Sequence, residues 1–264
     1  MPKSLPVDRT VFAAHAAHAA HAVRTVRMAL VASAAASAGM AGVAQAADFN
    51  AIGLLNQAEF LAFSKDVAAA VSYKGIMPTE GLGITGFDIG IAAFGTQVTS
   101  RDALRKAAGG SSIPKYLPTV ALKAVKGLPF DIDVGVTVAS LPGTNIRATG
   151  GELRWAFVSG STVLPAVGVR LALSNLSGVD QLKLKTQSAD ISISKGFAFF
   201  TPFAGIGTVR STSSAPGTSL REVSFSQTRT FVGANFALGP TSLAVETDKT
   251  GDSTGFGVKL AIRF

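Results

Sequence analysis

The sequence contains no cysteine, which excludes disulfides, thiolate metal sites and cysteine nucleophiles. Histidine is absent beyond residue 21, and the three that occur, His15, His18 and His21, form an Ala-Ala-His repeat. Charged residues make up only 15% of the chain and hydrophobic residues 47%, so the composition excludes an intrinsically disordered chain. We therefore expect one domain that buries or embeds a large apolar surface.

The formal net charge of +8 does not indicate a nucleic-acid-binding protein. Residues 1–46 hold four of the basic residues against a single acid, and the others are spread thinly along the chain. A domain that binds nucleic acid gathers its Lys and Arg on one face or stripe. We predict no nucleic-acid partner.

An export signal accounts for the N-terminal region. Residues 28–43 form an uncharged, Ala-rich run, preceded by Arg24 and Arg27 and followed by Ala44-Gln45-Ala46. This is the order of a secretory signal peptide, so residues 1–46 are predicted to be removed by a cut after Ala46. An uncleaved anchor is disfavoured, because Ala and Gly dominate where a spanning helix carries Leu, Ile and Phe.

The first 22 residues make this signal longer than the usual 15 to 30 or so. Our hypothesis is that translation starts at position 23 and that residues 1–22 are not translated, which fails if codon 23 is not an alternative start. The histidine repeat has metal-binding composition, but it lies upstream of the predicted cut. No metal site is therefore predicted in the mature chain.

Beyond residue 83 the sequence alternates between apolar and polar residues. From Phe130 to Val138 every even position is apolar and every odd one is polar or small, and the closing stretch from Phe256 to Phe264 does the same. A period of two is typical of strands whose faces meet different environments. Ten such segments are predicted, at 84–95, 117–126, 129–140, 146–158, 163–174, 182–194, 197–209, 224–238, 242–248 and 254–264.

Connection lengths predict how these strands are arranged. Those at 126–128, 159–161, 195–196 and 239–240 are tight, whereas alternate ones include the long polar stretches 96–116, 175–181 and 210–223. Short turns at one end, long loops at the other and an even strand number are typical of transmembrane barrels. We predict an all-β fold for residues 84–264, an antiparallel transmembrane β-barrel of about ten strands, with eight or twelve as alternatives.

A soluble β-sandwich also shows alternation. It is disfavoured because the charged face is the one that a barrel would enclose. Aromatic residues also gather near segment ends, as in an interfacial girdle: Tyr116, Phe130, Trp155, Phe157, Phe197, Phe256 and Phe264. No apolar run of 18 residues follows the signal, so spanning helices are excluded.

Residues 47–83 do not alternate. Asn56 and Glu59 have the spacing of a capping box, and apolar residues recur at helical spacing from Phe60 to Val71. A short helix is predicted at 57–71. It could plug the barrel lumen or cap the periplasmic rim, and a further alternative makes Ala68 to Ile76 another strand edge.

One segment changes its apolar face. Leu182 and Leu184 are even, whereas Ile191 and Ile193 are odd. A β-bulge around Thr186 to Ser188 is predicted to restore the register.

Odd and even positions along each strand face opposite sides of the wall. The positions that would face the lumen carry a nearly balanced set of charges. They would form either a ladder of ion pairs that fills the lumen or a polar lining for a narrow water path. A barrel of ten strands is closer in size to the small barrels whose interior is filled by side chains than to the large porins that hold an open channel. The predicted lumen-facing residues are Asp88, Lys123, Asp131, Asp133, Glu152, Arg154, Arg170, Asp190, Arg229, Glu246, Asp248, Lys259 and Arg263.

The last eight residues, Gly257-Val258-Lys259-Leu260-Ala261-Ile262-Arg263-Phe264, alternate and end in Phe, and Thr201-Pro202-Phe203-Ala204-Gly205-Ile206-Gly207 has a Pro-aromatic-x-Gly-x-Gly pattern. In these features the chain resembles Gram-negative outer-membrane β-barrel proteins. The resemblance implies location in the bacterial outer membrane, contact with its lipid and lipopolysaccharide, and a role for Phe264 as the signal that the barrel-assembly machinery reads. It does not specify the oligomeric state.

The resemblance is weak for function, since such barrels include porins, enzymes, adhesins and structural proteins. The barrel enzymes of that class use a histidine, which the mature chain lacks, so we predict no enzyme, no catalytic residue and no cofactor. Asp131 with Asp133 is more typical of partners for arginine. Gly205-x-Gly207 has no accompanying phosphate-loop motif, which favours a packing role.

The expected function is a porin-like or structural barrel that allows at most slow passage of small polar solutes. The alternative is a surface binding or adhesion protein that uses the loops at 96–116 and 210–223.

Overall fold

The computed structural model describes residues 49–264. The predicted signal peptide, its cleavage site and the Ala-Ala-His repeat lie outside the described residues. Among the residues described, no helix is both long and apolar enough to cross a membrane.

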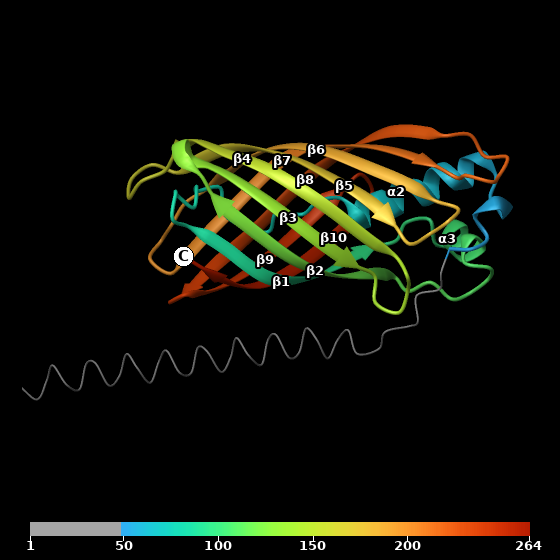
Figure 1. The fold of residues 1–264 in the computed structure, drawn as a ribbon, viewed down its shortest axis with the longest axis horizontal. Coiled ribbons are helices and arrows are strands. Elements are labelled where there is room, and N and C mark those ends of the chain that lie inside the picture. The colour runs from blue at the N-terminus through green and yellow to red at the C-terminus, as the bar shows by residue number, and fades with distance from the viewer. Residues whose placement is uncertain (1–48) are drawn as a thin grey trace, which may run out of the picture. The chain divides into compact units, whose positions relative to one another are not determined.

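Ten antiparallel strands form a closed barrel, which confirms the predicted fold class and strand number (Figure 1). Each strand pairs with its neighbours in sequence, and β1 pairs with β10 to close the barrel. At this seam Phe87 and Phe264 exchange backbone hydrogen bonds of 2.9 and 3.0 Å. The strands are β1 (Phe87–Gln97), β2 (Tyr116–Gly127), β3 (Ile132–Ser140), β4 (Arg147–Ser159), β5 (Ala166–Ser177), β6 (Lys183–Ser194), β7 (Phe200–Ser214), β8 (Val223–Leu238), β9 (Thr241–Thr250) and β10 (Ser253–Arg263).

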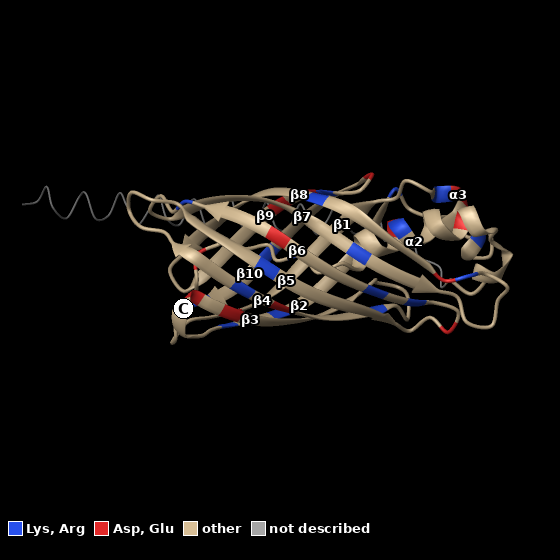
Figure 2. Cartoon of the chain, turned by 90° about the horizontal axis from the view of Figure 1, so that it is seen from above, with Lys and Arg blue, Asp and Glu red and all other residues tan. Residues whose placement is uncertain are grey.

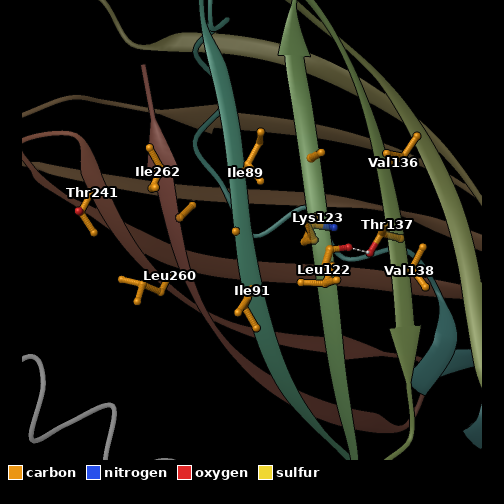
Figure 3. Close-up of a pocket in the computed structure, with 13 residues that line it drawn as sticks. Ile89, Ile91, Leu122, Lys123, Val136, Thr137, Val138, Thr241, Leu260 and Ile262 are labelled. Carbon is orange, nitrogen blue, oxygen red and sulfur yellow. Dashed lines mark hydrogen bonds between the residues drawn. The ribbon is translucent and has the colours of Figure 1, made fainter.

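The alternating residues separate into an apolar outer face and a polar inner face. On β3, Val136 and Val138 are exposed on the outside, whereas Thr137 is buried and donates to the Leu122 carbonyl at 3.2 Å. Figure 3 shows the same outer face on the neighbouring strands, where Ile89, Leu122 and Leu260 stand on the apolar side. Such an outer face suits contact with lipid chains.

Several strands begin later than the alternation predicts. Phe130 and Asp131 belong to the short helical turn η2 (Pro129–Asp131) and both have positive φ, so β3 begins only at Ile132. Val163 and Phe197 likewise lie in turns, and both are exposed. The turns at this end carry apolar side chains, so apolar–polar patterning does not mark where the strands end.

The β-bulge predicted around Thr186 to Ser188 is wrong. β6 keeps an unbroken register with both neighbours. Leu184 points inward, because the lumen is apolar at that level and packs against a helix. The register shift in the barrel lies instead on β4, between Trp155 and Val158.

Before the barrel begins, the chain passes through its lumen. It starts at the end that carries the longer loops, where η1 (Ile52–Leu54) lies beside α3 (Arg101–Ala107). The helix α2 (Gln57–Val71) then enters the barrel, and an extended stretch continues to β1 at the opposite end (Figure 1). We call residues 57–84 the plug. The predicted helix range and its capping box are both present, whereas the alternative strand edge at Ala68 to Ile76 is not.

The outer half of the plug is held by apolar packing. Phe60 and Phe63 on α2 are completely buried against the inner faces of the barrel and α3. Burying a side chain of this size contributes about 1.5 to 3 kcal/mol. The apolar residues around them include Leu104, Leu117, Leu182 and Leu184.

The loops at this end are more ordered than the sequence predicts. The connection from β1 to β2 contains α3, whose Lys106 ammonium lies 2.8 Å from Glu59 on α2. This hydrogen bond lowers the pKa of the Glu59 carboxyl. The predicted loop at 210–223 is shorter than expected, because β7 runs to Ser214 and β8 begins at Val223, which leaves residues 215–222 as the connection.

Candidate functional site in the plugged lumen

One row of paired residues carries charges across the inner wall. Strand register aligns them from β3 to β8 in the order Asp133, Arg154, Arg170, Asp190, Gly207 and Arg229. Arg154 donates to Asp133, and Arg170 donates to Asp190 through two nitrogens, at 2.9 and 2.5 Å. The row therefore holds two ion pairs, and the two arginines between them, Arg154 and Arg170, stand opposite each other. Figure 2 shows basic and acidic segments interspersed on the strands.

Gly207 leaves the space that this row needs between Asp190 and Arg229. A Cβ atom at Gly207 would stand 2.2 Å from Asp190 Oδ1. With glycine there, the Asp190 carboxylate lies 3.9 Å from the Arg229 guanidinium. The glycine pattern that the sequence analysis assigned to packing thus shapes the ion-pair row.

An aromatic ring is shared by the two central arginines. The guanidinium carbons of Arg170 and Arg229 lie 5.3 and 5.0 Å from the centroid of the buried Phe231 ring. Cations at such distances are attracted to the ring face. Gly205 makes room for this ring, since a Cβ there would lie 2.3 Å from it.

The middle of the plug is bound to the wall through charged groups. The Lys74 ammonium lies 2.8 Å from the Asp248 carboxylate on β9, and the Arg229 guanidinium donates to the Tyr73 carbonyl at 2.9 Å. From the opposite wall, Lys123 donates to the Lys74 carbonyl at 2.8 Å and its ammonium lies 3.8 Å from the Tyr73 ring centroid. Strands on different sides of the barrel therefore hold the same two plug residues.

The last part of the plug is held by polar contacts as well. Arg154 donates to the Pro78 carbonyl at 2.7 Å, and Asp133 accepts from the Leu82 amide at 3.0 Å. Thr79 hydrogen bonds to the hydroxyls of Ser192 and Ser194 on β6. This segment has no regular structure of its own, and the wall satisfies its backbone groups.

Two further acids of the predicted set lie near the turn end. Asp88 is buried and pairs with Lys259 at 2.8 Å, with the half-buried Arg263 4.0 Å away. Asp131 is not on the strand wall, because it lies in the η2 turn and accepts from Ser159 at 2.6 Å. The sequence analysis placed Asp131 inside by odd–even alternation, which applies only within a strand, and β3 has not yet begun at this residue.

The remaining predicted lumen residues join the central cluster. Glu246 accepts from Arg229 at 2.9 Å, and Glu152 lies 4.0 Å from Arg170. Lys74 and Tyr73 were missed by the sequence analysis, although Lys74 is the cation that pairs Asp248. The sequence feature that could have identified them is the position of Lys74, just beyond a helix predicted as a possible lumen plug.

Little space remains around the centre of the plug. The hollow between Tyr73, Lys74, Lys123 and the surrounding wall has about 20 Å³, enough for roughly one water molecule. Among residues 49–264, no group of three or more histidine or acidic side chains is arranged to hold a metal ion. The geometry is that of a packed, ion-paired interior.

Comparisons with known proteins find only distant structural likenesses. No family model and no curated protein matches the chain. Among solved structures, the KdgM porin has 7% identity and a TM-score of 0.39, over 67% of this chain and 99% of that one. Neisserial surface protein A has 9% identity and a TM-score of 0.29, over 67% and 94%.

A loop-deletion mutant of OmpT, an outer membrane protein of Vibrio cholerae, has 12% identity and a TM-score of 0.29, over 67% of this chain and 76% of that one. Likenesses this low carry no argument about function, so the fold rests on the strand pairing of the chain itself.

Proposed function

We propose that this chain is an outer-membrane protein whose barrel is sealed by its own plug and whose loop end faces the outside of the cell. In this function the barrel anchors an ordered surface platform and does not serve as a general pore. The observation that carries the proposal is the binding of Tyr73 and Lys74 to β2, β8 and β9 together.

The contacts of the plug support a sealed lumen. Removing it would leave the Asp248 carboxylate without the Lys74 ammonium and expose Phe60 and Phe63 on the helix, both of which are fully buried. An unpaired charge in a poorly hydrated interior is costly. Solutes could pass only when the plug leaves its place, and each such opening would require this free energy. Passage is therefore at most slow.

The outer face supports the membrane location. Apolar side chains line it around the barrel, and aromatic residues such as Trp155, Phe157, Phe197 and Phe264 are exposed near the turn end. An apolar band flanked by aromatics is typical of outer-membrane barrels. With short turns on the periplasmic side, α3 and the β7–β8 hairpin would lie at the cell surface.

Planar bilayer recordings test the seal. The wild-type protein is expected to give no steady conductance steps, whereas Lys74→Glu, which sets two carboxylates against each other at Asp248, is expected to release the plug and give them. Lys249→Glu, at an exposed outer-face lysine on β9, is the matched control. Stable wild-type channels would overturn the proposal, as would equal conductance in both variants.

A second candidate function, binding of a surface partner, is favoured by the order of the loop end. Gln57 and Arg221 exchange hydrogen bonds of 2.9 and 3.0 Å, and Ala51 donates to Ala107 at 2.9 Å, so plug and loops form one platform. Its exposed cations include Arg105 and Arg221. Loss of cell attachment on replacing both by Gln, with insertion unchanged, would support this function.

A further inference from the structure

We propose that the outer face of β4–β7 holds a binding site for a phosphorylated, acylated glycolipid, the chemistry of lipopolysaccharide in the outer leaflet. This inference rests on the proposed orientation, which sets the loop end toward that leaflet. It concerns the outside of the wall and is independent of whether the lumen is sealed.

The first observation is a hollow in the outer wall. It has about 710 Å³ and lies over Gly151 and Ala189, with Leu153, Leu171 and Leu173 beside it. Gly151 forms the open floor, because a Cβ atom there would meet only the Gly135 carbonyl, at 3.4 Å. A hollow with these apolar walls suits an acyl chain.

The second observation is a group of cations beside that hollow, on the side nearer the loops. Arg210 lines the hollow itself and pairs in register with Gln187. Lys185 lies two residues further along β6, opposite Thr212, and is a diagonal neighbour of Arg210 on the same face. Such diagonal neighbours lie about 7 to 8 Å apart or slightly closer, so both side chains can reach one phosphate group.

None of these cations has a partner within the part of the chain that the structure describes. The side chains of Lys183, Lys185 and Arg210 are exposed and form no hydrogen bond or ion pair there. Their outward neighbours are hydroxyl or amide residues, among them Asn175, Thr212 and Ser214, whereas the nearby acids Asp180 and Glu222 lie in the connections. This contrasts with the lumen, where the arginines are paired.

Charge complementarity identifies the occupant. A lipid that fits must place an anionic headgroup at Lys185 and Arg210 and an acyl chain in the hollow below them. Phosphates on the sugar of a glycolipid meet arginine and lysine through charge-assisted hydrogen bonds, which are stronger than neutral ones. At the loop end of the wall, the outer-leaflet lipid supplies both parts.

The experiment measures binding of purified lipopolysaccharide to the full-length mature protein in detergent micelles, by the rise in its thermal unfolding midpoint. We expect saturable binding by the wild type and at least about a tenfold loss of apparent affinity in Lys185→Gln/Arg210→Gln. Gly151→Phe, which fills the hollow, is expected to lose affinity with the charges intact. Lys249→Gln, at another exposed outer-face lysine, is the control and should bind as the wild type does.

The proposal would be overturned by no binding by the wild type, by equal loss in the control, by unchanged binding in Gly151→Phe, or by equal binding of dephosphorylated lipopolysaccharide. Equal affinity for a phosphatidylglycerol would also overturn it, in favour of a general anionic-lipid surface. Inorganic phosphate alone should not compete at matched concentration. Because these measurements are made in micelles, a conducting lumen would not affect their result.

Discussion

The Lys74 ammonium and the Asp248 carboxylate, from the plug and from β9, are both almost completely buried and lie 2.8 Å apart. Replacing Lys74 by Met leaves the carboxylate without its closest cation. Breaking one partner of a buried pair costs about 3 to 5 kcal/mol, so we expect the free energy of unfolding in urea to fall by that order. Trp155, the single tryptophan, supplies the fluorescence signal.

The double variant Lys74→Met/Asp248→Asn should recover much of this loss, because it removes both charges. Lys249→Met changes an exposed lysine one residue away and should have little effect. Equal stability of the single and double variants would contradict the importance of this ion pair.

The absence of cysteine makes the plug position testable by cross-linking. The hydroxyl oxygens of Ser64 on α2 and Ser213 on β7 are 2.9 Å apart and buried. We expect Ser64→Cys/Ser213→Cys to form a disulfide on oxidation, seen as a mobility shift on non-reducing gels, because the two side chains already meet and a disulfide needs a short reach. Ser64→Cys/Ser226→Cys, with its second thiol exposed on the outer face, should stay uncross-linked.

We expect the stability of the barrel to be sensitive to a single added methyl group at Gly207. In Gly207→Ala the new Cβ would lie 2.2 Å from both the Ala189 carbonyl oxygen and Asp190 Oδ1, which would shift the Asp190 carboxylate and its contacts with Arg170 and Arg229. Overpacking of this kind costs about 1 to 3 kcal/mol. Gly151→Ala, whose Cβ projects into the outer hollow, should leave the urea midpoint nearly unchanged, and equal effects of the two would refute the steric argument.

Val136 tests the lipid-facing side of the wall. It is 61% exposed on the outer face of β3, and an arginine near the bilayer midplane of a barrel costs roughly 2 to 4 kcal/mol. Val136→Arg should therefore lower the unfolding midpoint in lipid vesicles. Ser177→Arg, exposed at the loop end of β5, should be close to neutral, and the same result for both would mean that this face is not in lipid.

Phe264 remains a predicted assembly signal. Its ring lies 5.0 Å from that of Phe87 and is 64% exposed on the outer surface, so its contact with lipid would contribute about 1.5 to 3 kcal/mol, as that of another outer-face Phe would. We expect Phe264→Ala to lower the yield in the outer membrane far more than Phe256→Ala, an outer-face aromatic also on β10. Equal outer-membrane yields of the two variants in a fractionated Gram-negative host would mean that Phe264 has no special role in assembly.

The sequence predicts the barrel well because a period of two assigns each strand residue to one of two environments. Val136 and Arg154 follow that rule. Asp131 does not, since it lies in a turn where parity has no structural meaning. Leu184 departs from it because the inner environment itself changes, from charged near Arg170 to apolar beside α2.

The candidate site could be predicted only in part. The lumen charges follow from parity, but their pairing depends on strand register, which sequence alternation leaves open. Lys74 follows no period, since it lies in an extended stretch that the wall organises. The partners of the plug could therefore be found only from the three-dimensional arrangement.

The passage of the plug through the lumen also constrains the order of assembly. Residues 57–84 run from the loop end to the turn end before β1 begins, and the interior leaves almost no free space around Tyr73. A chain that joined β1 to β10 first would have to thread residues 57–84 from one end of a closed barrel to the other. We therefore expect closure of the β1–β10 seam to follow capture of the plug, so that the N-terminal segment acts as a template for the barrel that encloses it.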